Sequence, residues 1–300
     1  MNSKSESYRG QWGGKIESGE EMWWTEPDRR LRDRSFFRRI RFYLDVRQHF
    51  LIRFLRYGIT AAKKRGVEVP KIVDFGCGTG GTGMNFSHFL GIPFQGFDIF
   101  QTQIGIAQEL AQKFQSPCTF GLLNADGSFP LPDQSIDVIF SADVLGHVPD
   151  IPKTLAHWAR ALKTGGVVSL FTESTHSLDD QSQMAQLSRQ GFDMVSMVPE
   201  HISLFPKEKL EAWFRSAGFE ILDRVSANVG HWFFFPKDYV TLLKNQPTQR
   251  KVYLRSLIWS KISKILPFYP IPHEFFRLVL TYFFGRSDLG TAYFYLLRKN

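Results

Sequence analysis

Four glycines follow a short apolar stretch in VDFGCGTGG, which spans residues 73–81. Ile72, Val73 and Phe75 are typical of the end of a buried strand, and the apolar–polar pattern after the glycines predicts a helix. A glycine turn between a strand and a helix lets a nucleotide-type cofactor approach the main chain. The spacing leaves two cofactor types open, because the glycines fit the G-x-G-x-x-G fingerprint of dinucleotide enzymes as well as a G-x-G-x-G turn.

Two acidic residues follow the next two predicted strands. Asp98 ends the stretch FQGFDI, twenty-two residues after Gly76, where a carboxylate can accept hydrogen bonds from ribose hydroxyls. Asp126 follows the stretch CTFGLLN and could accept a hydrogen bond from an adenine amino group. The alternatives are a helix N-cap for Asp98 and a tight turn for Asp126, which precedes Gly127. The spacing favours the cofactor role for Asp98, while both interpretations of Asp126 stay open.

The chain around these residues alternates predicted strands with predicted helices. The strand-like stretches begin with KIVDF at residue 71 and continue through IDVIFSA and VVSLFTE to FEILDRVSA, which ends at residue 227. Such an alternation predicts an α/β fold with a mostly parallel sheet covered by helices on both faces. A chain of 300 residues with 43% hydrophobic residues is long enough for one main core with added elements.

The order of four motifs resembles the class I S-adenosylmethionine-dependent methyltransferases. The motifs are VDFGCGTG, GFDI, NADGSFPLPDQSIDVIFSADVLGHVPD and LKTGGVVSLF, and the resemblance covers roughly residues 71–235. It is especially similar to the branch with small-molecule, lipid and quinone acceptors. The resemblance implies S-adenosyl-L-methionine as the cofactor and a Rossmann-like sheet of seven strands whose last strand is antiparallel. The stretch GTAYFYLLRK at 290–299 is the expected last strand.

Two other functions remain as alternatives. A non-catalytic partner subunit could keep the same fold and the same cofactor. An NAD(P)-binding oxidoreductase is less favoured, because it gives no reason for Asp126 and LKTGG to accompany the glycine turn.

By resemblance, seven residues at strand ends would bind the cofactor: Asp74, Gly76, Gly78, Asp98, Ile99, Asp126 and Ser141. The methionine and ribose part would lie over Gly76 and Gly78, with its amino group near Asp74. Ser141 would follow the fourth strand, beneath the methionine. We expect the glycines to lack side chains because the cofactor passes over them.

For three of these residues, the resemblance implies contact with the adenosine part of the cofactor. Asp98 would hold the ribose hydroxyls, Ile99 would lie beside the adenine, and Asp126 would hold the adenine amino group. For Asp126 this implication favours the cofactor role over the turn.

Methyl transfer requires alignment of the acceptor with the methyl group and exclusion of water, and a hydroxyl acceptor also benefits from a general base. His147, in DVLGHVPD, is the first candidate, because that loop borders the methyl group in the family. His201, in PEHISLFPKEKL, is the second, because the segment after the fifth strand often covers the acceptor. The alternative for both is a structural histidine. His147 favours oxygen as the acceptor atom.

One difference from the family pattern concerns whether the site binds a metal ion. The ubiquinone-type O-methyltransferases resemble this region but carry acids around the histidine, in a pattern like E-V-L-E-H-V. Here Asp143 replaces the first acid, and Gly146 stands where the second would be. We therefore expect no metal site.

Charge is distributed unevenly along the chain. Residues 1–70 carry sixteen Lys/Arg and nine Asp/Glu, residues 71–234 carry ten and seventeen, and residues 235–300 carry eleven and three. With the motifs, this predicts four parts: a basic N-terminal extension over 1–70, helical from about residue 34; the methyltransferase core over 71–235; a basic, aromatic-rich helical insert over 236–289; and the final strand over 290–300.

The basic flanks predict contact with an anionic surface. In the insert, YLRSLIWSKISKIL places several aliphatic residues near one helical face: Leu254, Leu257, Ile258, Ile262 and Ile265. An interfacial helix on an anionic membrane is one interpretation, together with the apolar residues of 34–65, and a pocket roof or a dimer contact is the other. Nucleic-acid binding is disfavoured, because the apolar residues are too dense for a solvated phosphate-binding surface.

The sequence carries no sign of export. The two cysteines form no disulfide framework, the first residues lack an apolar signal region, and no apolar run approaches the ~18 residues of a membrane span. We expect a cytoplasmic protein, peripheral at the inner face of a membrane, that acts on a small-molecule or lipid-linked acceptor. Its oligomeric state is left open.

Overall fold

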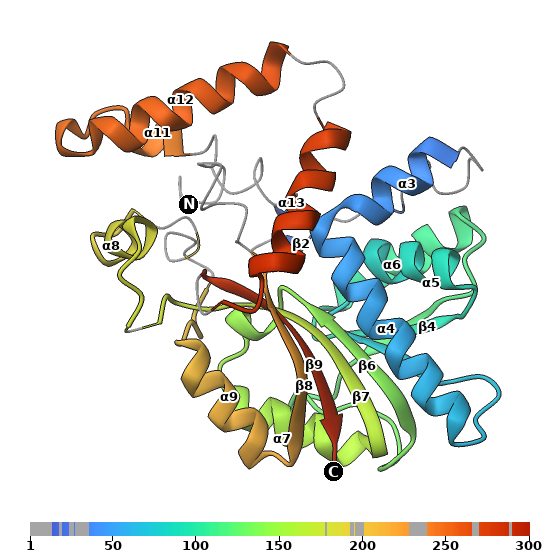
Figure 1. Ribbon diagram of the computed structural model, residues 1–300. Coiled ribbons are helices and arrows are strands. Elements are labelled where there is room, and N and C mark those ends of the chain that lie inside the picture. The colour runs from blue at the N-terminus through green and yellow to red at the C-terminus, as the bar shows by residue number, and fades with distance from the viewer. Residues whose placement is uncertain are drawn as a thin grey trace.

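A seven-stranded sheet forms the centre of the protein (Figure 1). The structure, a computed structural model, describes residues 14–17, 20–23, 27, 36–177, 179–192, 195, 201–227, 239–265, 270–287 and 290–300. The strands are β3 (Ile72–Phe75), β4 (Phe94–Asp98), β5 (Thr119–Leu122), β6 (Ile136–Ala142), β7 (Leu162–Glu173), β8 (Phe219–Ser226) and β9 (Ala292–Lys299). A separate antiparallel pair is formed by β1 (Gly14–Glu17) and β2 (Glu20–Trp23).

The strand order is β5-β4-β3-β6-β7-β9-β8. The first five strands in this order are parallel, and β9 runs antiparallel between β7 and β8. The predicted fold class, with seven strands and an antiparallel last strand, is confirmed. The position of β9 inside the sheet was not part of the prediction. It follows from the pairing of Phe294 with Phe171 on one side and with Val225 on the other.

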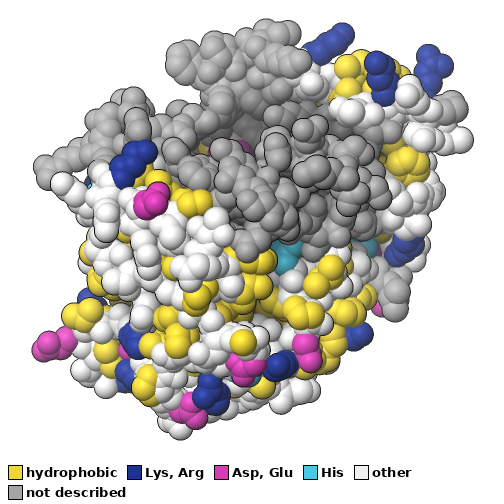
Figure 2. Space-filling view, turned by 180° about the vertical axis from the view of Figure 1, so that it is seen from behind, with side chains coloured by type: hydrophobic (Ala, Val, Ile, Leu, Met, Phe, Trp, Pro, Cys, Tyr) yellow, Lys and Arg dark blue, Asp and Glu magenta, His cyan; other side chains and the backbone are white. Residues whose placement is uncertain are grey.

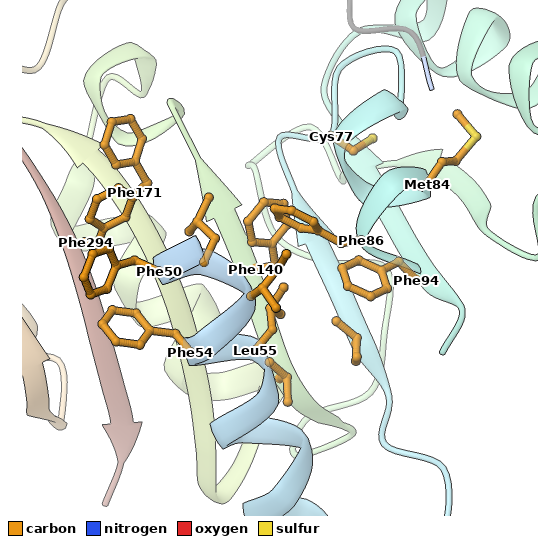
Figure 3. Packing of buried hydrophobic residues seen from close by; sticks show 14 of the residues in the cluster. Phe50, Phe54, Leu55, Cys77, Met84, Phe86, Phe94, Phe140, Phe171 and Phe294 are labelled. Carbon is orange, nitrogen blue, oxygen red and sulfur yellow. The ribbon is translucent and has the colours of Figure 1, made fainter. Parts of the chain in front are cut away.

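Helices cover both faces of the sheet. On one face lie α4 (Val46–Lys64), α5 (Gly81–Leu90) and α6 (Gln101–Lys113), and on the other lie α7 (Ile151–Ala161) and α9 (Lys207–Ser216). The strands supply both cores because successive side chains point to opposite faces. In β6, Val138 and Phe140 belong to the first core and Ile139 to the second. Figure 3 shows Phe140 among the aromatic side chains of the first core.

Helix α4 packs directly on the sheet, although it precedes the boundary predicted at residue 70. Its N-cap is Asp45, whose side chain accepts a hydrogen bond from Gln48 N. Phe50 and Phe54 lie on its buried face, next to Phe294 of β9 (Figure 3). A Cβ atom at Gly58 would lie 2.9 Å from Val138 Cγ2, so that glycine allows the close approach of helix and sheet. The division of the chain into four parts stays a prediction.

The remaining helices lie outside these two layers. They are α3 (Phe36–Leu44), α8 (Gln183–Arg189), α11 (Tyr239–Leu243), α12 (Arg250–Ile265) and α13 (Pro270–Phe284). Helices α8, α11 and α12 share a small apolar cluster that includes Met184, Leu243 and Val252. Helix α13 packs against α3 and α4. Among the described residues, none of the helices is both long and apolar enough to cross a membrane.

The insert lies at one end of the sheet. In Figure 1, β9 runs downward to the C-terminus, so the parallel strands run upward, and α11, α12 and α13 lie above their carboxyl ends. Carboxyl ends of parallel strands are where ligands bind in open α/β sheets. The insert therefore lies at the end of the molecule where the strand-end residues gather.

The burial of α4 yields the first prediction. Phe54→Ala should lower the free energy of unfolding by about 3–5 kcal/mol, because it removes a fully buried aromatic ring between α4 and the sheet. Tyr57→Ala, at an exposed position of the same helix, should change it by less than about 1 kcal/mol. Urea unfolding of the whole chain measures both. Equal effects would mean that α4 is not part of the core.

Candidate active site

The glycine turn joins β3 to α5 in a left-handed backbone conformation. Gly76, Gly78 and Gly80 have φ values of 71°, 52° and 78°, which favour residues without a side chain. The turn is held against the next strand, because Gly76 N donates a hydrogen bond to Phe97 O at 2.8 Å. This places the main chain of the turn beside the carboxyl end of β4.

Two of these glycines are required by packing within the protein. A Cβ atom at Gly76 would lie 2.5 Å from Val144 Cγ2, and one at Gly80 would lie 2.5 Å from Phe120 Cζ. Such distances are shorter than van der Waals contact, so neither position accepts a side chain without movement of its neighbour. The expectation that the cofactor passes over the glycines stays a prediction, but at Gly76 and Gly80 packing within the protein is by itself a reason for the missing side chain. Val144 and Phe120 already occupy the space there.

Asp74 is a buried carboxyl group near the glycine turn. Its Oδ2 atom accepts no hydrogen bond, although it lies in the interior. Burial, together with the nearby charge of Asp98, raises the pKa of Asp74 to about 8. A buried carboxyl group of this kind is stabilised as the anion by a nearby cation. The part of the chain that the structure describes provides Asp74 with no ion-pair partner.

Asp98 lies at the end of β4 and closes the other side of the turn. Its Oδ2 atom accepts a hydrogen bond from Gly78 N at 2.9 Å, and its Oδ1 atom accepts one from Phe100 N at 3.1 Å. Burial raises the pKa of Asp98, while these backbone hydrogen bonds oppose the shift. The next side chain, Ile99, is 60% exposed and offers an apolar surface beside the carboxyl group.

The structure places Asp126 in a turn. Its Oδ1 atom accepts hydrogen bonds from Ser128 N at 3.0 Å and from Ser128 Oγ at 2.7 Å. These bonds hold the pKa of Asp126 below its usual value. Gly127 has a φ of 82° and donates to Asn124 O, as expected for a tight turn. The turn accounts for the observed contacts of Asp126, and its role toward adenine stays a prediction.

Ser141 lies within β6 rather than after it. The side chain is completely buried, and its hydroxyl group donates to Phe75 O at 3.1 Å. This bond ties β6 to β3 beneath the glycine turn. Cys77, in the turn itself, is also buried, and burial raises the pKa of its thiol well above the usual value.

The two candidate bases lie in contact, although 53 residues separate them in the sequence. The ring centroids of His147 and His201 are 4.6 Å apart. His147 ends a short 3₁₀ turn, η1 (Leu145–His147), which follows β6. The segment that carries His201 is held against this turn, because Ile202 N and Ser203 N both donate to Gly146 O. Their catalytic role stays a prediction.

A pair of acids, one buried and one partly buried, lies beside these histidines. Asp143, which follows β6, forms an ion pair with Arg47 of α4. Glu173, the last residue of β7, is buried next to Asp143. Burial raises the pKa of Glu173 well above its usual value, and the Asp143 carboxyl group adds to the shift through its charge and a hydrogen bond. Asp143 has a φ of 59°, which is uncommon for a residue other than glycine.

Glu173 also occupies space beside Gly146. A Cβ atom at Gly146 would lie 3.5 Å from Glu173 Oε2 and 3.1 Å from His201 Cδ2. The family pattern has an acid at position 146. Here the carboxyl group of Glu173, from β7, lies close to that position instead. Sequence reasoning missed Glu173 and Arg47. The signal for Glu173 was a carboxylate that ends the otherwise uncharged strand VVSLFTE.

Another histidine, His176, follows β7 in the stretch FTESTHS. It is largely buried, with its Nδ1 atom 2.9 Å from Asp180 Oδ2. His231 and Trp232, which follow β8 in the sequence, lie outside the described residues.

Within the residues that the structure describes, no group of three or more His, Cys, Asp or Glu side chains is arranged to hold a metal ion. The expectation of a metal-free mechanism stays a prediction.

Comparison with known proteins decides between the cofactor types. Residues 47–224, from the start of α4 into β8, match the methyltransferase domain family. The chain belongs to this family. Its cofactor is S-adenosyl-L-methionine. The match begins within α4, in agreement with the packing of that helix on the sheet.

Individual relatives are distant from this methyltransferase domain. The ajmaline N-methyltransferase of Rauvolfia serpentina is 25% identical over 180 residues, which cover 59% of this chain and 52% of that protein. The demethylmenaquinone methyltransferase of Tropheryma whipplei is 32% identical over 137 residues, or 44% and 55% of the two chains. The chain thus spans about half the length of these curated relatives.

A solved structure shares the fold. The crystal structure of the [4+2]-cyclase SpnF matches with a TM-score of 0.50 and 18% identity, over 81% of this chain and 80% of that chain. At this identity the likeness concerns the fold alone.

The residues present fit the cofactor. The buried Asp74 carboxyl group, whose Oδ2 atom has no partner, suits the ammonium group of an amino acid, and Asp98 with exposed Ile99 suits a ribose and a flat apolar ring. When bound, S-adenosyl-L-methionine supplies a methyl group already activated by its sulfonium sulfur. The chain then has to bind, orient and shield the reactants.

The raised pKa of Asp74 predicts a pH dependence of cofactor binding. A cation beside Asp74 favours the ionised form, so binding at pH 6–8 should release a proton, and affinity should rise with pH up to about 8. The rise should approach about tenfold per pH unit. Titration calorimetry with S-adenosylhomocysteine measures it.

The control for this measurement is Asp74→Asn, which should bind more weakly and lose the pH dependence. Asp133→Asn, at an exposed carboxylate, should behave like the wild type. An unchanged pH dependence in Asp74→Asn would show that Asp74 does not meet the cofactor's cation.

The buried Glu173 predicts how stability depends on pH. The unfolded chain loses this proton near the ordinary pKa of 4.5, whereas the folded chain keeps it to higher pH. The folded state therefore binds more protons, and the free energy of unfolding should fall as pH rises above about 4.5, by up to about 1.4 kcal/mol per unit.

Glu173→Gln should remove the part of this fall that comes from Glu173, because glutamine mimics the neutral acid, and should leave the part that comes from the raised pKa of Asp74. Urea unfolding at pH 5 and pH 8 should show a smaller difference for this variant than for the wild type or for exposed Glu220→Gln. The same difference in all three proteins would place the titration elsewhere.

Proposed function

We propose that the protein transfers a methyl group from S-adenosyl-L-methionine to an oxygen atom of a small or lipid-linked acceptor, with His147 and His201 taking the acceptor's proton. The observation that carries this proposal is the contact between the two imidazole rings, 4.6 Å apart, beside the glycine turn. Val144 connects the two regions, because it packs on Gly76 and precedes the η1 turn that ends in His147.

The hydrogen bonds of His201 support its use as a base. Its Nδ1 atom lies 2.8 Å from Val195 O. Because a carbonyl oxygen only accepts, Nδ1 carries the hydrogen of the neutral ring, and Nε2 is the nitrogen that can take a proton. Nε2 lies 3.6 Å from the position of a Cβ atom on Gly146. The absence of a side chain at Gly146 therefore allows the His201 ring and the Glu173 carboxyl group to approach this turn closely.

The acid pair supports the charge balance of such a step. A proton taken by His201 makes its ring cationic, and this positive charge would favour the ionised form of the nearby Glu173 carboxyl group, whose pKa burial otherwise raises. Glu173 Oε2 lies beside the same Gly146 position and accepts no hydrogen bond. Arg47 meanwhile neutralises Asp143. We infer that the two acids and Arg47 hold the histidines in place and respond to the proton.

The acceptor class is inferred from the chemistry of the site. One relative is named as an N-methyltransferase of ajmaline and another as a methyltransferase of demethylmenaquinone, so the names of the relatives do not point to one acceptor. Oxygen is proposed because a hydroxyl acceptor has a proton that a histidine can remove. A lipid-linked acceptor is proposed because α12 and α13, at the same end of the sheet, expose large apolar side chains.

Transfer of a labelled methyl group tests this function. The whole chain is incubated with methyl-labelled S-adenosyl-L-methionine and a cell extract fractionated into lipid, quinone, glycan and protein. Label in the lipid or quinone fraction, on an oxygen atom, is the expected result. Label on nitrogen or carbon would overturn the oxygen assignment. Cofactor binding without transfer to any fraction would instead support the non-catalytic partner subunit.

Substitution of the histidines tests the base. His147→Asn and His201→Gln should each lower kcat by about 10²-fold or more, because a general base contributes that much. The loss should shrink as pH rises, since an acceptor hydroxyl that ionises by itself no longer needs a base; a structural role would show no such recovery. His88→Gln, on an exposed side of α5, is the matched control. Turnover within a few-fold of wild type would contradict the role of that histidine.

A further inference from the structure

Helix α13 turns an apolar face toward the outside. Leu278, Leu280 and Thr281 are its buried residues, and buried Gly285 lies just beyond the helix end. Phe275 and Phe283 lie on the other side and are 55% and 78% exposed. A helix on the surface of a globular protein normally shows the reverse pattern, with apolar residues inside and polar residues outside.

Local hydrogen bonds fix this orientation of α13. Ser226 N, at the end of β8, donates to Gly285 O, which anchors the carboxyl end of the helix to the sheet. Tyr282 Oη lies 2.6 Å from His49 Nε2 of the buried helix α4. The exposed phenylalanines are therefore held outward by contacts on the other side of the helix.

Helix α12 has a mixed outer face. Val252 and Ser256 are buried, and Val252 packs in the cluster with α8 and α11. Leu254 and Ile258 are 44% and 56% exposed, although both were expected to share an apolar face with residues such as Leu257. Exposed basic residues lie between and beside them: Arg250, Lys251, Arg255 and Lys261. The outer face of α12 thus interleaves aliphatic and cationic side chains.

The charge of this region is strongly one-sided. Residues 239–287 contain eight Lys/Arg and one acid, Glu274, in the sequence. Glu274 forms an ion pair with Arg277 on its own helix. Figure 2, turned by 180°, shows dark blue side chains around yellow ones at the upper right, where α11 and α12 lie.

We propose that the outer faces of α12 and α13 form a docking surface for an anionic lipid bilayer. Exposed phenylalanine and aliphatic side chains would enter the boundary between headgroups and acyl chains, and the lysines and arginines would contact anionic headgroups. The helices would lie in the plane of the interface, because none of the described helices can span a membrane. Membrane binding follows from this surface alone. The further idea that the membrane delivers a lipid acceptor to the site rests on the proposed function.

Charge favours a bilayer over a second copy of the chain. In a two-fold symmetric dimer, the same patch meets itself across the interface. The basic residues of α12 would then face one another, and like charges oppose association. An anionic bilayer supplies the opposite charge together with an apolar layer. The helix α4 does not contribute, because its apolar face is buried against the sheet.

Vesicle binding by the full chain tests the surface. Vesicles of equal parts phosphatidylcholine and phosphatidylglycerol should retain the protein in sedimentation at low salt, and pure phosphatidylcholine vesicles should retain much less. Binding should weaken with salt because headgroup attraction acts over a screening length of about 8 Å. A residual, salt-resistant part should remain from the apolar side chains. This experiment needs neither cofactor nor methyl acceptor, so its outcome is separate from that of the transfer assay.

Two double variants, each with a control variant, identify which side chains bind the vesicles. Lys251→Gln/Lys261→Gln should bind anionic vesicles roughly 25-fold more weakly, or about fivefold for each lysine near the surface. Lys63→Gln/Lys64→Gln, at exposed positions at the carboxyl end of α4, should bind like the wild type. Phe275→Ser/Phe283→Ser should lose the salt-resistant part, whereas Val69→Ser, also at an exposed apolar residue, should keep it.

Three outcomes would overturn the proposal. One is equal retention by neutral and anionic vesicles at low salt. Another is equal loss of binding in the α12 variant and its α4 control. The third is a dimer in sedimentation velocity that disappears in Phe275→Ser/Phe283→Ser, which would make this face a contact between copies of the chain.

Discussion

Several acidic side chains lie at the carboxyl edge of the sheet. The unfavourable free energy of burying their charges is the constraint on which the rest of the site depends. Four adjacent parallel strands each carry an acid at or within one residue of their carboxyl end: Asp74, Asp98, Asp143 and Glu173. All four are wholly or largely buried, where ionised carboxylates are unfavourable without a partner. Among the described residues, Arg47 is the cation that pairs with one of these acids, Asp143, and the raised pKa of Asp74 marks a place where a bound cation would be stabilising. A sulfonium cofactor with an ammonium group meets that electrostatic requirement.

Helix α4 connects this electrostatic edge with the rest of the molecule. Its first turn carries Arg47 to Asp143, its middle fills the core with Phe50 and Phe54, and His49 meets Tyr282 of α13. Arg47 also lies over the ring of Phe171, 5.1 Å from its centroid, which fixes the guanidinium group near the end of β7. A change in the position of α4 would therefore reach the acid pair and the insert together.

Local sequence patterns were sufficient to predict the main secondary-structure elements. The stretch IDVIFSA forms β6 with the predicted bounds, and the glycine turn, the strand ends at Asp98 and the antiparallel last strand also agree with the structure. These features depend on residues next to one another in the chain: period-two apolar patterns, turn glycines and strand-end acids. Motif order added the family, because four spaced motifs constrain one another more than any one of them does.

Tertiary structure decided which distant residues meet. The contact of His147 with His201, the placement of Glu173 beside Gly146, and the packing of Val144 on Gly76 all join separate segments through the register of the sheet. Helical periodicity suggested one apolar face for α12, but the burial of Val252 against α8 turned Leu254 and Ile258 outward. A sequence pattern shows that a helix has an apolar side, whereas only its packing partners determine which side is covered. By itself the sequence determined the fold class and, through the order of its motifs, predicted the family and its cofactor; the shape of the acceptor side was decided by contacts between segments far apart in the chain.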